Sequence, residues 1–146
     1  MNNEKVEILL VEDNPSDEEL TLHALKKYKL ANKIFVARDG AEALDYIFAE
    51  GEYSGRDAKQ YPKLILLDLK LPKVDGLEVL CRIKEDEDLR SIPTVVLTTS
   101  NTESDMARAY ENGAGSYLVK PVDFEKFAKL MDTFGFYWLA WNKYPE

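Results

Sequence analysis

Five side chains with complementary chemistry end or follow four apolar segments that lie far apart in the sequence. They are Glu12 and Asp13, Asp68, Thr98 and Lys120. If the segment ends meet, three carboxylates share one small site, where like charges disfavour the ionised forms unless a counter-charge is present. A hard divalent cation such as Mg²⁺ supplies that charge and keeps some of its waters, which leaves room for a phosphate. The residue types therefore favour phosphoryl transfer.

Within such a site the carboxylates divide into a nucleophile and a metal-binding pair. A carboxylate can attack phosphorus and form an aspartyl-phosphate. We predict Asp68 as the nucleophile because it stands alone after its segment, whereas Glu12 and Asp13 are adjacent and suit the metal. Mg²⁺, the Lys120 ammonium and the Thr98 hydroxyl would neutralise charge on the phosphoryl oxygens. Any one of these residues alone is more often a helix cap or a solvated charge; their coincidence favours chemistry.

Short apolar runs place these residues in a regular architecture. Runs of this kind predict buried parallel strands, and helical spacing of apolar residues fills the gaps between them. The expected strands are Val6 to Val11, Lys33 to Ala37, Leu64 to Leu67, Pro93 to Thr98 and Ser116 to Val119. This alternation predicts an α/β fold: a doubly wound, five-stranded parallel sheet with helices on both faces. The carboxyl ends of its strands share one edge, where ligands bind.

The connections carry recognisable helix and turn signals. Asn14 or Asp13 can cap the helix after the first strand, and Asp75 can cap the helix after the third. Gly113 predicts a helix end, since glycine adopts the left-handed conformation there. The stretch 50–62 has no periodicity and predicts a loop of unusual length.

Composition narrows the class of protein. The chain has 146 residues, 45% of them hydrophobic, which suits one domain, 1–146, with no separate output domain. Its net charge of −8 argues against nucleic acid as a partner. We expect no membrane span and no signal peptide, and therefore a cytoplasmic protein. The single cysteine, Cys81, is expected to be a small core residue, and the single histidine, His23, to be solvated.

Four phrases of the sequence resemble one known family. ILLVEDN, LILLDLKLPKVDG, PTVVLTTS and GAGSYLVKP are similar to the receiver domains of bacterial two-component response regulators, the CheY-like fold. The resemblance implies a sheet of order 2-1-3-4-5 and a cis peptide at Lys120-Pro121. It also implies roles for seven residues: Asp68 as phosphoacceptor, Glu12 and Asp13 as metal ligands, the backbone carbonyl of Lys70 as a further ligand, Thr98 and Tyr117 as the switch, and Lys120 as the ion-pair lysine.

A narrower resemblance suggests a partner. The long loop 50–62, the phrase KPVDFEKF and the aromatic FYWL tail look like the small stand-alone regulators paired with bacterial phytochromes and similar hybrid histidine kinases. The implied partner is a sensor histidine kinase. The chain departs from many receivers at Thr99, where Ala or Gly is common. Lys70 and Ser100 occupy the other positions that tune phosphoryl lifetime in the family.

The output is expected at the surface of the C-terminal segment 122–146. Its aromatic residues exceed what one buried stripe requires, and such residues often anchor partners. We expect a homodimer through the last helix, its tail, the fourth helix and the fifth strand, coupled to the site by Tyr117. The interface candidates are Phe134, Tyr137, Trp138 and Trp141. The alternative is that the tail folds back over the core.

Other function classes remain open at this point. One is a phosphorelay shuttle that passes the phosphoryl group to a histidine phosphotransfer protein. Another is a haloacid-dehalogenase-type phosphatase, although that family has a second Asp where this chain has Lys70. A flavodoxin-like carrier is disfavoured because the loop EDNPSDEE would repel the FMN phosphate. Beyond phosphotransfer to Asp68 and its own dephosphorylation, we expect no enzyme activity.

Overall fold

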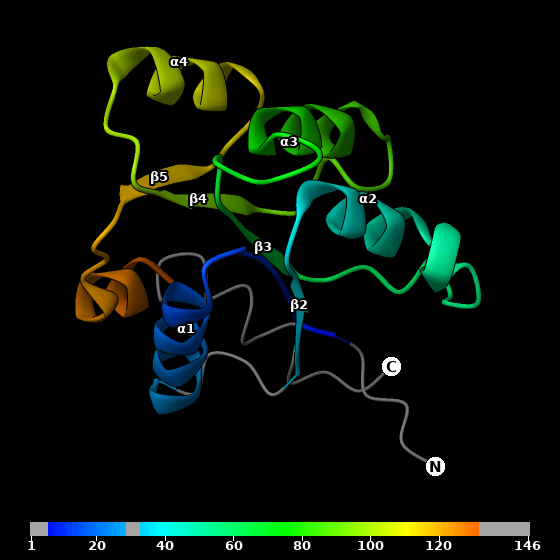
Figure 1. Cartoon of the computed structure of the whole chain (residues 1–146), viewed down its shortest axis with the longest axis horizontal. Coiled ribbons are helices and arrows are strands. Elements are labelled where there is room, and N and C mark those ends of the chain that lie inside the picture. Colours follow the sequence, from blue (N-terminus) through cyan, green and yellow to red (C-terminus); the bar gives the residue numbers. More distant parts are fainter. Residues whose placement is uncertain (1–5, 29–32, 132–146) are drawn as a thin grey trace.

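Strands and helices alternate along the chain, and all five strands join one parallel sheet of order β2-β1-β3-β4-β5 (Figure 1). The computed structural model describes residues 6–28 and 33–131. The expected fold and strand order are confirmed. The elements are β1 (Ile8–Val11), α1 (Pro15–Lys27), β2 (Ile34–Ala37), α2 (Gly40–Phe48), the 3-10 turn η1 (Gly51–Tyr53), β3 (Leu64–Leu67), α3 (Gly76–Glu85), β4 (Thr94–Thr98), α4 (Glu103–Glu111) and β5 (Ser116–Val119).

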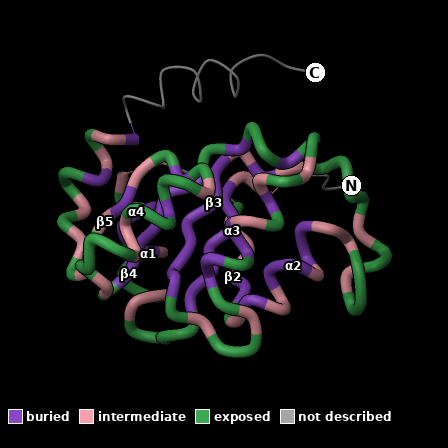
Figure 2. The backbone as a smooth tube through the Cα atoms, turned by 90° about the horizontal axis from the view of Figure 1, so that it is seen from above, coloured by how far each residue is buried: buried purple, intermediate pink, exposed green. Residues whose placement is uncertain are grey.

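The sheet separates two apolar clusters, because successive side chains of a strand point to opposite faces. Leu9 and Val11 of β1 pack with α2, α3 and α4, while Ile8 and Leu10 pack with α1 and the last helical turns. Figure 1 shows the corresponding layers, with α2, α3 and α4 on one side of the sheet and α1 on the other. Buried residues lie along the strands and the inner sides of the helices (Figure 2). Burial on both faces explains why the strands read as continuous apolar runs.

The strands are slightly shorter than the sequence suggested. Val6, Lys33 and Pro93 fall just outside β1, β2 and β4. Backbone hydrogen bonds still join Lys33 and Pro93 to the neighbouring strands, since the Lys33 carbonyl accepts the Glu7 N–H at 2.8 Å and the Pro93 carbonyl accepts the Ile65 N–H at 3.0 Å. The strand positions are therefore right, and only their first residues differ.

Helix ends follow the expected signals in part. Asn14 caps α1, and its side chain accepts the Asp17 N–H at 3.0 Å. Gly113 follows α4 with a φ of +97°, which glycine adopts without strain. Asp75 occupies the N-cap position of α3, but its side chain makes no capping hydrogen bond. The predicted N-cap position of Asp75 is therefore confirmed, although only its backbone carbonyl bonds to the helix, accepting the Val79 N–H at 3.0 Å.

The exposure of several helix residues departs from what their apolar character and helical spacing suggest. Leu20 shares the helical spacing of buried residues in α1, yet 59% of it is exposed. Tyr110 of α4 is 50% exposed. Cys81 is half-buried rather than a core residue, because it lies at the border of the buried face of α3. His23 is exposed, as expected.

The long loop is fixed by one arginine that the sequence did not single out. Arg56 donates to the carbonyls of Tyr46 and Ile47 at the end of α2, at 2.8 and 3.2 Å. Its guanidinium also lies 4.3 Å from the centre of the Tyr46 ring. Tyr53 adds a hydrogen bond of 2.6 Å to Glu42. The loop is thus ordered through contacts with α2.

The chain continues after β5 into helical turns over 124–131, whose backbone N–H groups are capped by Asp123. Phe127 and Met131 are buried against the sheet. The proposed interface residues lie outside the described residues: Phe134, Tyr137, Trp138 and Trp141. None of the helices in the described part of the chain has the length and apolar character that crossing a bilayer requires.

Candidate functional site

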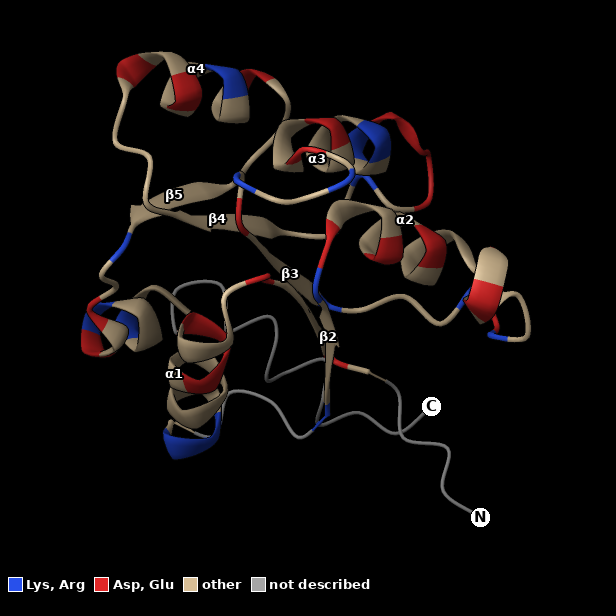
Figure 3. Cartoon of the chain, in the orientation of Figure 1, with Lys and Arg blue, Asp and Glu red and all other residues tan. Residues whose placement is uncertain are grey.

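Backbone hydrogen bonds bring three of the expected site residues to one edge of the sheet. The N–H of Glu12 donates to β2 at 3.0 Å, that of Asp68 to β1 at 3.1 Å and that of Lys120 to β4 at 2.7 Å. Each residue directly follows its strand, so the parallel register aligns them. Figure 3 shows the result, with acidic segments after β1 and β3 and a basic segment after β5. The Lys120-Pro121 peptide is cis, as expected.

Three carboxylates form the acidic part of the site. Ligand oxygens of Glu12, Asp13 and Asp68 lie within 4.8 Å of one another. Glu12 and Asp68 are 1% and 6% exposed, whereas Asp13 faces solvent. An all-oxygen set that is open on one side matches the ligands of hard cations such as Mg²⁺ and Mn²⁺. The residues present therefore fit a divalent metal, as the sequence predicted.

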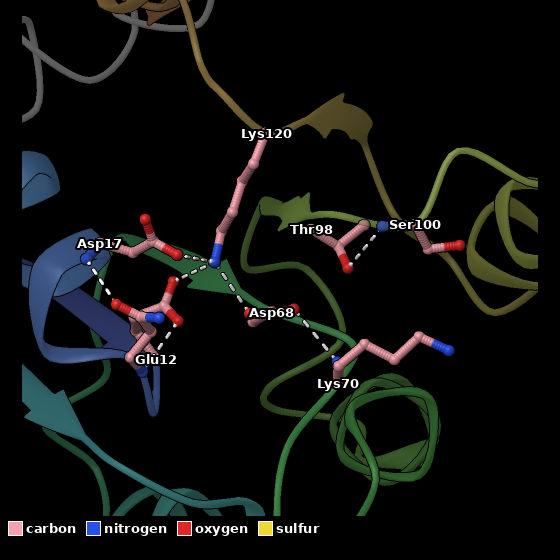
Figure 4. Close-up of polar contacts among 8 residues, drawn as sticks. Glu12, Asp17, Asp68, Lys70, Thr98, Ser100 and Lys120 are labelled. Atoms are coloured by element: carbon pink, nitrogen blue, oxygen red, sulfur yellow. Dashed lines mark hydrogen bonds and ion pairs between the residues drawn. The ribbon is translucent and has the colours of Figure 1, made fainter.

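Lys120 ties the carboxylates together (Figure 4). Its Nζ lies 2.7 Å from Glu12 Oε1, 2.9 Å from Asp68 Oδ2 and 2.9 Å from Asp17 Oδ2. Only 11% of its side chain is exposed. Burial opposes the charged form, but the hydrogen bonds that the ammonium donates to these carboxylates outweigh it and raise the pKa of Lys120. The lysine is therefore held as a cation beside Asp68.

Burial disfavours the ionised form of the Glu12 carboxyl. Burial raises its pKa to about 7, against the lowering effect of Lys120, and the nearby charge of Asp68 adds to the increase. One lysine does not fully compensate the cluster, so a further positive charge there would be stabilising.

Both carboxylate oxygens of Asp68 accept hydrogen bonds. Its Oδ2 accepts from Lys120, and its Oδ1 accepts the backbone N–H of Lys70 at 3.1 Å. The Lys70 ammonium points elsewhere, 3.7 Å from Asp105 of α4. That the Lys70 carbonyl binds the metal stays a prediction.

The two expected switch residues meet at a residue between β4 and α4. Thr98 is fully buried, and its hydroxyl accepts the Ser100 N–H at 3.4 Å. The Tyr117 hydroxyl donates to the Ser100 carbonyl at 2.9 Å, and the ring is 9% exposed. The Ser100 hydroxyl in turn donates to Asp105. Thr98 and Tyr117 are thus linked through Ser100 rather than directly, and their switching roles remain predictions.

Two carboxylates of this region were missed from the sequence, Asp17 and Asp105. Both lie in the first turn of a helix, where acidic residues are common because they suit the helix dipole. Because the helix dipole already accounts for these acids, their contacts with the site could not be inferred from the sequence. For Asp17 the signal was its place three residues after the Asn14 cap, on the turn nearest the first strand end.

A comparison with protein families identifies the whole arrangement. Residues 8–132 match the response regulator receiver domain. The chain belongs to this family. The receiver domain covers nearly all of the described residues, including the acidic cluster and Lys120.

Two curated relatives have similar receiver chains. A probable methanogenesis regulatory protein FilR2 of Methanothrix harundinacea is 47% identical over 138 residues, covering 94% of this chain and 86% of the relative. Response regulator Rcp1 of Synechocystis is 41% identical over 132 residues, covering 90% and 88%.

Solved structures agree with this assignment. The bacteriophytochrome response regulator AtBRR is 55% identical over 90% of this chain and 94% of that one, with a TM-score of 0.77. The Mn²⁺-bound form of Rcp1 is 41% identical over 93% and 95%, with a TM-score of 0.76. The phosphorylated cyanobacterial phytochrome regulator RcpA is 38% identical over 98% and 100%, with a TM-score of 0.77. The resemblance to phytochrome-linked regulators is confirmed.

Proposed function

We propose that this receiver domain accepts a phosphoryl group on Asp68 from a sensor histidine kinase of the phytochrome type, in a reaction that depends on Mg²⁺. The observation that carries the proposal is the placement of Asp68, with one oxygen on Lys120 at 2.9 Å and the other on the Lys70 N–H at 3.1 Å. These donors orient the carboxylate. The Mn²⁺ in the Rcp1 structure and the phosphorylation of RcpA support the same chemistry here.

The transfer step follows from these contacts. An Asp68 oxygen attacks phosphorus; the new O–P bond forms as the N–P bond of the phosphohistidine breaks, and the imidazole nitrogen keeps that electron pair. Glu12, Asp13 and Asp68 would hold Mg²⁺, which neutralises charge on the phosphoryl oxygens. Lys120, at the same edge of the sheet after β5, would donate to these oxygens, and the Thr98 hydroxyl lies at the end of the neighbouring strand β4.

The test uses acetyl phosphate as the donor. Asp68→Asn should abolish Mg²⁺-dependent labelling of the intact protein, seen by mass spectrometry as a loss of the phosphoryl adduct. Asp88→Asn is the matched control, because this exposed aspartate lies in the segment after α3, away from the site. Labelling of Asp68→Asn at the wild-type rate would show that another residue is the nucleophile. We expect neither the wild-type protein nor these variants to turn over phosphate esters.

For the output we propose a homodimer that forms through the surface around α4 and β5. Two apolar side chains of this surface are open to solvent, Tyr110 at 50% and Val119 at 37%. The Tyr110 ring centre lies 6.5 Å from that of Tyr117, which contacts Ser100. This adjacency connects the surface to the site.

Sedimentation with and without beryllofluoride and Mg²⁺ tests the dimer. A mass that rises on addition of this phosphoryl analogue supports dimerisation as the output. A mass that stays monomeric at high concentration excludes it, and transfer of the label to a histidine phosphotransfer protein would then indicate a relay shuttle.

A further inference from the structure

Asp17 is a third partner of Lys120 that the family roles assigned above leave unused. Its Oδ2 lies 2.9 Å from Lys120 Nζ, as close as Asp68 Oδ2. An ammonium group has three N–H donors, so Glu12, Asp17 and Asp68 together use all of them. Figure 4 shows the lysine reaching down between Asp17 on one side and Asp68 on the other. Asp17 therefore contributes to fixing the position of the cation.

Asp17 differs from the other two partners in what else it does. Glu12 and Asp68 both belong to the acidic cluster that fits a metal, whereas Asp17 does not. Asp68 also changes during the reaction, because the attacking oxygen exchanges its negative charge for a bond to phosphorus. Only Asp17 is free of a second task in the proposed chemistry.

The backbone holds Asp17 in this position. It lies in the first turn of α1, where its N–H is bound by the Asn14 cap at 3.0 Å. Its side chain is 32% exposed, compared with 11% for that of Lys120. The carboxylate can therefore keep some hydration while it accepts from the buried ammonium.

We propose that Asp17 is a positioning residue that anchors Lys120 throughout phosphoryl transfer. The anchor keeps the ammonium beside the reacting atoms while one of its N–H donors passes from Asp68 Oδ2 to an oxygen of the phosphoryl group. This inference rests on the proposed function of Asp68. It concerns only how the lysine is held, because Asp17 touches neither the metal cluster nor the reacting oxygen.

Labelling by acetyl phosphate at saturating Mg²⁺ tests the anchor. Asp17→Ala should slow labelling about tenfold, as expected for loss of a charge-assisted hydrogen bond, and Asp17→Asn, which keeps an acceptor, should slow it less. Glu19→Gln is the control: it removes one charge from the exposed face of the same helix. The affinity for Mg²⁺ should change no more in Asp17→Asn than in Glu19→Gln.

A double-mutant cycle separates the anchor from a general effect of charge or of the helix dipole. In a Lys120→Met background, Asp17→Ala should change the labelling rate by less than about twofold, since its partner is gone. A tenfold effect that persists without Lys120, or an equal effect of Glu19→Gln, would overturn the proposal. Asp68→Asn is included in each series; if it is labelled, the proposed function itself fails, independently of Asp17.

Unfolding in urea provides a second readout that needs no labelling. The shift of the urea midpoint caused by Asp17→Ala should depend on Lys120 both without metal and at saturating Mg²⁺. The corresponding dependence of Glu12→Gln on Lys120 should weaken when Mg²⁺ is added, because Glu12 belongs to the metal cluster. Loss of the coupling between Asp17 and Lys120 on addition of Mg²⁺ would contradict an anchor that persists.

Discussion

Glu12 is the residue at which burial and metal binding oppose each other. Its carboxyl has an ordinary pKa of 4.5, which burial raises to about 7 in the folded protein. Between these values the folded state binds the proton more tightly than the unfolded state does. The free energy of unfolding of the metal-free protein should therefore fall as pH rises from 4.5 to 7 through the folded pKa.

Binding of Mg²⁺ should depend on pH for the same reason. The ion needs the ionised carboxylate, so one proton must leave Glu12 for each ion bound at pH values below about 7. The affinity should fall about tenfold for each pH unit below that value. Calorimetric titrations between about pH 5.5 and pH 8 measure this slope. The affinity should stop changing with pH above about pH 7, where Glu12 is already ionised.

Glu12→Gln supplies the control for this pH dependence. The amide keeps the shape of the side chain and cannot ionise, so the variant should bind Mg²⁺ more weakly and with little change across the same pH range. A wild-type affinity that is equally flat would mean that Glu12 stays ionised or that it does not bind the ion.

The start of α2 and the loop after β3 pack with their backbones in direct contact. Gly40 opens α2, and its N–H donates to the Pro72 carbonyl at 3.2 Å. A Cβ at Gly40 would lie 1.9 Å from the Val74 carbonyl oxygen and 2.7 Å from its carbon. The Gly76 N–H donates to the Leu69 carbonyl across the same loop, next to Asp68, the proposed phosphoacceptor. The position of α2 is therefore coupled to the loop that carries Lys70.

Gly40→Ala should disturb both stability and the site. Alanine favours helices, but the backbone of the loop must move to admit the methyl group, and overpacking of this kind costs about 1–3 kcal/mol. Urea unfolding measures the loss, and labelling by acetyl phosphate should slow with it. Gly55→Ala is the control because a Cβ there has no heavy atom within 4 Å. Equal stability of the two variants would show that the loop adapts without cost.

The elements themselves could be predicted because their signals are local. A strand such as LILL is buried on both faces and is apolar throughout, and the Asn14 cap lies within three residues of the N–H it accepts. Leu20 and Arg56 could not be predicted in this way. Whether a leucine at helical spacing is covered, and which carbonyls an arginine reaches, depends on neighbours brought together by the fold.

Some residues of the acidic site could also be predicted from the sequence, and others could not. Its main residues could be predicted because parallel strands must end on one edge, which places Glu12, Asp68 and Lys120 together. Asp17 was missed because its partner, Lys120, lies 103 residues away and the helix dipole already explains an acid at that position. Ser100 was singled out only as a position that tunes phosphoryl lifetime in the family, because its contacts with Thr98, Tyr117 and Asp105 come from two strands and a helix that are separate in the sequence.

Ser100 connects the proposed phosphorylation site to the surface proposed for dimerisation. Its N–H, carbonyl and hydroxyl contact Thr98, Tyr117 and Asp105 respectively. Asp105 also faces Lys70 at 3.7 Å. A movement of Thr98 toward a phosphoryl group on Asp68 would therefore displace Ser100 and change its contacts with both α4 and β5.

Tyr117→Phe isolates this connection, because it removes one hydroxyl and keeps the ring. The Ser100 carbonyl then loses a hydrogen bond worth about 1 kcal/mol, while Asp68 and Lys120 keep all their contacts. Labelling by acetyl phosphate should stay within about twofold of wild type, whereas beryllofluoride should produce a smaller increase in sedimenting mass. Tyr61→Phe removes a hydroxyl in the loop 50–62, outside α4 and β5, and serves as control. A full response of Tyr117→Phe would place the coupling elsewhere, because the hydroxyl is its only direct link to Ser100 among the described contacts.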